Sequence, residues 1–172
     1  MPGVIDPHTG PKVIGAYSFS ITDAPGVVAA NNFLAFFVPS TATISQGLLG
    51  IIISSYAIGS SGTANSMLLQ RITSASGGTL ATPSTIARFI TTMPDPQTQI
   101  FTNNPTVTTS ESVIGGFPPI FSVGTGNSGI GVFTTPPGLT AELLPGQGVV
   151  LGTSAGNTNQ RWNIQFNWEE FI

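Results

Sequence analysis

Large apolar side chains alternate with polar ones near the end of the chain. From Trp162 to Trp168 every second residue is large and apolar, and the residues between them are Asn or Gln. Successive side chains of a strand point to opposite faces, so this pattern predicts a strand over residues 161–169 with one face on a core. The same alternation predicts a strand over residues 12–21.

Other short segments rich in Ile, Val, Phe and Thr predict further strands, and clusters of Gly, Pro, Asn and Ser separate them. These segments are residues 32–38, 48–57, 66–73, 85–92, 97–102, 110–114, 120–123, 129–134 and 148–153. No segment has the apolar stripe and charged opposite face of a three-turn helix. The only helical candidate is a turn over residues 24–31, after the possible cap Asp23. The pattern therefore predicts an all-β domain, a sandwich or a barrel.

Residues 48–53 are apolar at nearly every position, which favours a strand in the middle of a sheet. On an exposed edge such a strand would be prone to aggregate, because it has high β-propensity and no charge. Two explanations remain open: packing within the subunit, or an interface between subunits.

The chain length fits one domain, residues 12–172, preceded by an extended arm over residues 1–11. Three prolines and two glycines keep this arm from forming a helix or a central strand. It is expected either to be disordered in a monomer or to lie across a neighbouring subunit, anchored by Val4 and Ile5.

Charged residues are scarce, at 6% of the 172 residues, and none lies between Asp23 and Arg71. Ordinary soluble domains have about 25%. The apolar runs are too short for a membrane span, which needs about 20 residues, and 40% hydrophobic content argues against disorder. A subunit surface covered by copies of itself or by partners is the remaining explanation.

Residues 152–156 match the G-x-S-x-G pattern of hydrolases, with Ser154 as the nucleophile. That motif requires a strand that turns into a helix and a histidine that follows the serine. Here a strand follows, and the only histidine, His8, precedes it. We interpret the segment as a hairpin turn.

Other apparent motifs are equally weak. Residues 124–129 match G-x-G-x-x-G, but a strand and two prolines follow where a dinucleotide site needs a helix. Glu169 and Glu170 are neighbours on a strand and point to opposite faces. Asp6 and His8 on the arm make a weak metal site, and the four basic residues form no cluster for nucleic acid. We therefore expect no enzyme, no cofactor, no metal site, and no nucleic-acid or membrane partner.

Residues 68–79, and residues 144–148 together with 163–170, resemble small structural proteins of tailed bacteriophage particles. The shared features are a strand that ends in an arginine, a Gly/Thr turn, and a last strand that closes on Trp-Glu-Glu. They cover about a third of the chain. The resemblance implies an antiparallel β-sandwich of jelly-roll type.

The resemblance also implies a head decoration or cement protein, made in the host cytoplasm and located in the virion. Such a subunit is expected to form a homo-oligomer, with a trimer favoured, and to bind the major capsid protein or another virion protein. The alternatives are a collar, head-fibre or tail component, or a module that binds a receptor glycan. The candidate assembly contacts are Val4, Ile5, Leu48, Ile51, Ile53, Trp168 and Phe171.

Overall fold

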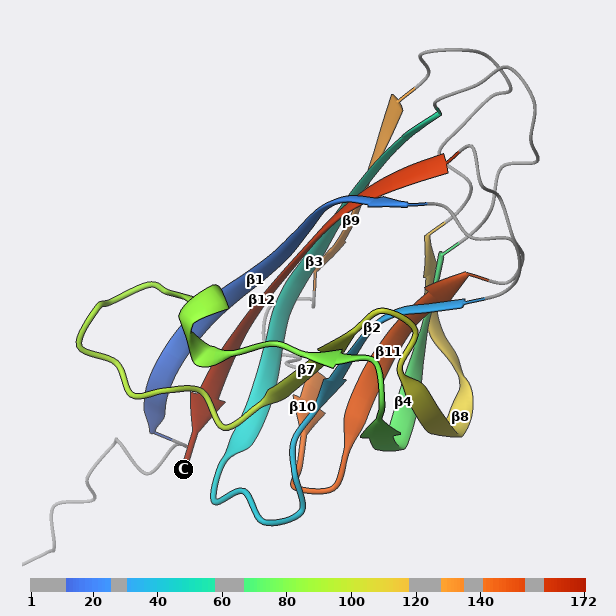
Figure 1. Cartoon of the computed structure of the whole chain (residues 1–172). Helices are drawn as coiled ribbons and strands as arrows, with labels where there is room; N and C mark the ends of the chain where they lie inside the picture. The colour runs from blue at the N-terminus through green and yellow to red at the C-terminus, as the bar shows by residue number, and fades with distance from the viewer. Residues whose placement is uncertain (1–11, 26–30, 58–66, 118–127, 135–140, 154–159) are drawn as a thin grey trace, which may run out of the picture.

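The computed structural model describes residues 12–25, 31–57, 67–117, 128–134, 141–153 and 160–172. Most of these residues lie in strands, and the helical element among them is the 3-10 turn Pro83–Thr85. The strands form two antiparallel sheets that pack face to face as a β-sandwich (Figure 1). The prediction of an all-β sandwich is confirmed, and the predicted arm over residues 1–11 lies outside the described residues.

Sheet A has the strand order β10-β3-β12-β1-β6, and β9 also pairs with β3. Its strands are β1 (Val13–Pro25), β3 (Ser45–Ala57), β6 (Ala87–Arg88), β9 (Ser128–Thr134), β10 (Ala141–Leu143) and β12 (Gln160–Phe171). The long strands β1, β12 and β3 lie side by side through the sandwich (Figure 1). β9 and β10 pair with successive parts of β3, so together they fill one position of the sheet.

Sheet B has the strand order β5-β7-β2-β11-β4-β8. Its strands are β2 (Asn31–Phe37), β4 (Met67–Ser76), β5 (Thr79–Leu80), β7 (Gln99–Thr102), β8 (Thr106–Phe117) and β11 (Gly148–Thr153). The segment between β4 and β8 leaves sheet B after β5, pairs briefly with β1 through β6, and returns as β7. This segment therefore connects the β1 side of sheet A with the β2 side of sheet B.

Aromatic rings fill the space between the sheets. Phe36 of sheet B stacks on Phe166 at a centroid distance of 4.5 Å and meets the edge of Trp168 at 4.8 Å. Tyr17 lies 5.4 Å from Trp168 in the same core. Offset and edge-to-face contacts of this kind add to the stabilisation from apolar burial. The alternating C-terminal segment thus supplies the centre of the core, as its pattern predicts.

Sheet B has a smaller apolar cluster on its other face. Ala35, Ile72 and Val150 are buried there beneath partly buried neighbours, among them Phe37 and Phe101. These side chains largely cover one another, so this face leaves few large apolar groups in contact with solvent.

Several predicted elements differ from the structure. The helical turn over residues 24–31 is wrong at its ends, because Ala24 pairs with Trp162 in β1 and Asn31 begins β2. The strand over residues 85–92 is also wrong, since only Ala87–Arg88 pair with β1. The predicted strand over residues 120–123 lies outside the described residues. The two-residue β5 and three-residue β10 are too short to show alternation in the sequence.

Candidate assembly surface

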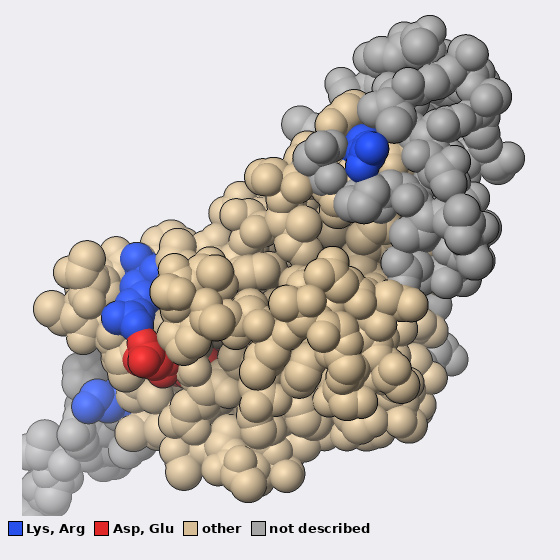
Figure 2. All heavy atoms as spheres, in the orientation of Figure 1, with Lys and Arg blue, Asp and Glu red and all other residues tan. Residues whose placement is uncertain are grey.

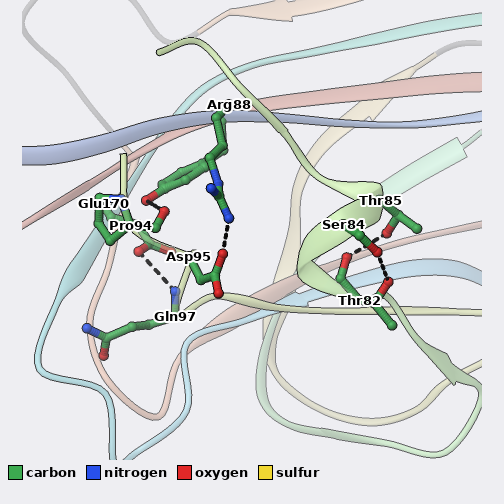
Figure 3. A network of polar contacts seen from close by, with 9 residues as sticks. Thr82, Ser84, Thr85, Arg88, Pro94, Asp95, Gln97 and Glu170 are labelled. Atoms are coloured by element: carbon green, nitrogen blue, oxygen red, sulfur yellow. Dashed lines mark hydrogen bonds and ion pairs between the residues drawn. The ribbon is translucent and has the colours of Figure 1, made fainter. Parts of the chain in front are cut away.

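A buried carboxylate holds the segment between β6 and β7 against sheet A. Glu170 near the end of β12 is 1% exposed. The backbone N–H of Gln97 donates to its Oε2 at 3.0 Å (Figure 3). The backbone N–H and hydroxyl of Thr98 donate to its Oε1 at 2.8 and 2.7 Å. Three donors of one loop thus compensate a charge that would otherwise be costly to bury.

The same loop makes two further contacts beside Glu170. The Tyr17 hydroxyl donates to the carbonyl oxygen of Pro94 at 3.0 Å, and Arg88 forms an ion pair with Asp95 (Figure 3). Burial raises the pKa of the Tyr17 hydroxyl, the Glu170 carboxylate adds to the rise, and Arg88 opposes it. Tyr17 therefore remains a neutral donor. These contacts all tie the loop to the sheet, so we assign the cluster a structural role.

The described residues contain no group of three or more His, Cys, Asp or Glu side chains placed to hold a metal ion. Ser154 and His8 of the hydrolase motif lie outside the described part of the chain. The hairpin interpretation of this segment is wrong, because β11 before it belongs to sheet B and β12 after it belongs to sheet A. It is a connection between sheets, and a strand follows it, whereas the hydrolase motif needs a helix.

Within the described ranges, no helix has the length and apolar character needed to cross a membrane.

The outward side of sheet A is formed by the outward side chains of β1, β12, β3 and β9, and we call it the outer face of sheet A. Its central residues are amides and hydroxyls. Asn163 donates to the hydroxyl of Ser54 at 3.2 Å, while Gln165 donates to Ser18 at 3.3 Å and to Asn167 at 3.1 Å. These contacts order the polar groups across neighbouring strands, so the face presents a neutral surface whose side chains support one another.

Aliphatic groups interrupt this polar surface on β3 and β9. Ile52 and Val132 are direct cross-strand partners and are 38% and 59% exposed, and Leu49 at the bulge in β3 is 38% exposed. Next to Ile52 lies a shallow hollow of about 260 Å³, lined by Ser20, Ile21, Thr22, Ile52, Ser54, Asn163, Ile164 and Gln165. The outer face therefore combines an uncharged hollow with exposed aliphatic groups.

Four of the predicted assembly contacts are core residues. Leu48, Ile51, Ile53 and Trp168 are at most 1% exposed and belong to the main hydrophobic cluster between the sheets. Their assignment as surface contacts is wrong, because their strand parity directs them inward. The structure favours burial within the subunit for residues 48–53, although Leu49 and Ile52 of the same run point outward.

The other predicted contacts lie near the ends of the chain. Phe171 is half-buried on the outward side of β12, where it pairs with the exposed Val13. Val4 and Ile5 lie outside the described residues. Sequence reasoning missed Ile52 and Val132 because they are aliphatic, like the core residues. Only their place in the alternation of the strand puts them on the outward side.

No family model, curated protein or solved structure matches this chain. The resemblance to phage structural proteins, noted above from short motifs, therefore stays a prediction. Charged side chains occupy only small areas of the side seen in Figure 2. Any assignment of function must come from the strand order and the surface chemistry of the chain itself.

Proposed function

We propose that the chain is a non-enzymatic structural subunit of a virion, which decorates or cements the head of a tailed phage. The observation that carries this proposal is the strand order of the two sheets. It is joined by the low charge of the chain and by the neutral outer face of sheet A. Fold alone does not determine function, so the surface chemistry has to support the same conclusion.

We infer that the sandwich is of jelly-roll type. The order β1-β12-β3-β9 in sheet A and β2-β11-β4-β8 in sheet B supports this inference. In both sheets, strands close in space come from both ends of the chain, as in two interleaved Greek keys. Jelly rolls recur in viral capsid and lectin domains, which is why the strand order favours a virion protein and keeps a glycan-binding module as the second candidate.

A cement subunit stabilises a shell by mass action, because a protein that binds only the assembled state lowers its free energy. Neutral surfaces suit this task, since few ions must lose water when subunits meet. The proposed subunit is a homo-oligomer, with a trimer favoured, and it binds the major capsid protein or another virion protein. Val4, Ile5 and Phe171 remain candidate contacts.

Two measurements test this proposal. Particles purified by density gradient from the source of the chain should contain it in many copies, and electron microscopy should place it on the head. The isolated protein should be larger than its subunit mass of 17.7 kDa in light-scattering measurements. Absence of the chain from purified particles would refute the proposed role, and localisation on a collar or tail would move the subunit to that position.

The second candidate is a module that binds a receptor glycan. The hollow beside Ile52 favours it, because amide and hydroxyl side chains surround an aliphatic group there. Saturable binding on a glycan array, lost on replacing Ser54 by a bulky residue, would support this function. An array without a hit would remove it.

A further inference from the structure

The segment between β6 and β7 exposes two large apolar side chains at its turn. Phe89 and Ile90 are neighbours in sequence and are 63% and 56% exposed. The segment extends beyond the sandwich beside β1 (Figure 1), and the backbone N–H of Met93 closes the turn on the carbonyl oxygen of Ile90 at 3.1 Å. We call residues 89–93 the apolar tip. Single exposed apolar residues are ordinary, whereas two large neighbours on one projecting turn indicate a contact site.

Contacts on both sides hold the apolar tip in place. The backbone N–H of Phe89 donates to the carbonyl oxygen of Ala16 at 3.1 Å, directly after the pairing of β6 with β1. On the other side, Pro94 accepts a hydrogen bond from Tyr17, and the ion pair described above closes the base of the segment. A contact made by an ordered segment loses less conformational freedom on binding. The tip is therefore preorganised as an anchor.

The hollow beside Ile52 on the outer face of sheet A can receive such an anchor. Its volume is about 260 Å³, whereas a cavity of about 150 Å³ is large enough to hold a benzene ring. The amide groups at the hollow already have partners. Asn163 donates to Ser54, and Gln165 donates to Ser18. An aromatic ring can therefore cover these groups without breaking their hydrogen bonds.

The apolar tip cannot fill the hollow of its own chain. Phe89 lies opposite Ala16 in β1, and Ser20 of the hollow is four residues further along the same strand. At about 3.3 Å per residue, this separation is about 13 Å, and the contacts of the tip keep it at its own end of β1. Every copy of the chain carries both features, so a second copy can supply the side chain that the hollow lacks.

We propose that the apolar tip of one subunit inserts Phe89 into the hollow on the outer face of sheet A of a neighbouring copy. This inference rests on the proposed function as a self-associating subunit. Because the tip and the hollow are different surfaces, the contact is heterologous, and head-to-tail contacts form a ring when their rotation closes. The favoured trimer is then a ring with three equivalent contacts.

Charged groups near the two surfaces do not oppose this contact. The tip, residues 89–93, contains no charged residue, and Arg88 at its base is paired with Asp95. Asp23 of β1 and Arg161 of β12 lie beyond the hollow in their strands, at the end away from the tip. Arg161 interacts within its own chain. The contact therefore depends on apolar burial and requires no ion pair between subunits.

The contact is small. Covering the exposed parts of Phe89 and Ile90 buries about 200 Å² of the tip, compared with about 800 Å² per partner in a stable complex. One contact alone is therefore expected to be weak. In a closed ring each subunit makes two contacts, and subunits held together on one particle have a high effective concentration.

Complementary variants isolate a single contact. Phe89→Ala removes the ring from the tip and leaves the hollow intact, whereas Ser20→Trp fills the hollow and leaves the tip intact. Both positions are exposed, so both variants should fold. In sedimentation velocity the natural chain should form trimers at high concentration, and each variant alone should remain monomeric. A mixture of the two variants can make only one contact, so it should stop at a heterodimer.

Nuclear magnetic resonance detects this heterodimer even when it is weak. Isotope-labelled Phe89→Ala is titrated with unlabelled Ser20→Trp at millimolar concentration, and the amide signals of Ile52 and Gln165 should shift in a saturable way. The double variant lacks both features and should cause no shift. Leu80→Ala is the matched surface control: Leu80 is 50% exposed at the edge of sheet B, and its loss should leave the trimers unchanged.

Three results would overturn the contact between tip and hollow: a natural chain that is monomeric throughout or stops at a dimer, single variants that associate like the natural chain, or a titration without shifts. Circular dichroism of each variant checks the fold. If Phe89→Ala weakens binding to purified shells but still forms trimers, the tip binds a shell protein and the proposal is wrong.

The two proposals fail separately. If the chain is abundant in purified particles but the titration shows no shift, the contact between tip and hollow is wrong and the virion role stands. If the chain is absent from the particles, the virion role is wrong whatever the titration shows.

Discussion

Replacement of Glu170 by Gln tests whether this carboxylate anchors the segment between β6 and β7. The substitution keeps the size of the side chain but turns one acceptor oxygen into an NH₂ donor. If the amide oxygen faces Thr98, the new donor faces the backbone N–H of Gln97, and the bond at 3.0 Å is lost. In the other orientation the bond from the Thr98 backbone N–H is lost, while the Thr98 hydroxyl can turn to accept from the amide. Either way, a buried donor is left without its acceptor.

The expected loss follows from the bonds affected. A hydrogen bond to a charged group contributes about 1.5–3 kcal/mol, and an unsatisfied buried donor costs about as much when its partner is removed. Relief from burying a charge offsets part of this cost. We expect Glu170→Gln to lower the free energy of unfolding by about 2–3 kcal/mol, and Tm by about 4–12 °C for a chain of this length.

Thermal and urea unfolding measure the loss, and Glu169→Gln is the matched control. It makes the same chemical change one residue earlier, on the outward face, and should alter stability by less than about 0.5 kcal/mol. Hydrogen exchange gives a local readout: the amides of Gln97 and Thr98 should exchange faster in Glu170→Gln, while Ile100 of β7 stays protected. Equal stability of the two variants would refute the anchoring role.

Three further substitutions have distinct expected outcomes. Trp168→Ala should destabilise the chain by about 3–5 kcal/mol through loss of core packing, whereas Phe171→Ala should cost far less in urea unfolding; similar losses would contradict the core assignment. Gln46→Met should raise the free energy of unfolding by about 1–2 kcal/mol, because both amide atoms of Gln46 are buried without a hydrogen-bond partner; a lower stability would show that the amide is needed. Tyr17→Phe should reduce the alkaline loss of stability. The raised pKa of Tyr17 means that the unfolded chain releases this proton at a lower pH than the folded chain. The stability present below the ordinary value of 10.0 is therefore lost as pH rises through the folded pKa. Parallel stability curves for the two proteins in unfolding scans across this range would contradict the reasoning.

Alternation in the sequence was sufficient to place the central strands and much of the core. The inward residues of β12 run from Gln160 to Glu170 at every second position, and Trp162 to Trp168 among them were recognisable as core. The same parity puts Glu170 inward, where a charge needs partners. Those partners lie more than 70 residues away in sequence, on a loop with no alternation of its own. Sequence alone therefore indicated the need for an anchor but not the residues that meet it.

The surface was harder to predict than the core. In residues 48–53 every apolar side chain looked alike in the sequence, yet Leu48, Ile51 and Ile53 point inward while Leu49 and Ile52 point outward. The pairing of β12 with β3 shifts in register between Asn167 and Trp168, which leaves a bulge at Leu49. The bulge breaks the regular alternation, so the sequence could not separate the inward residues from the outward ones. This bulge decides which side chains of residues 48–53 are exposed, and it can be identified only from the register of the paired strands.

Scarcity of charge gives the few remaining charges unusual weight. Arg88, Asp95 and Glu170 secure a loop within the subunit, and the outward positions of β12 between Arg161 and Glu169 hold only Asn and Gln. A neutral face can pack closely against a protein partner with little loss of ion hydration, so the distribution of charge is compatible with the proposed role of a structural subunit.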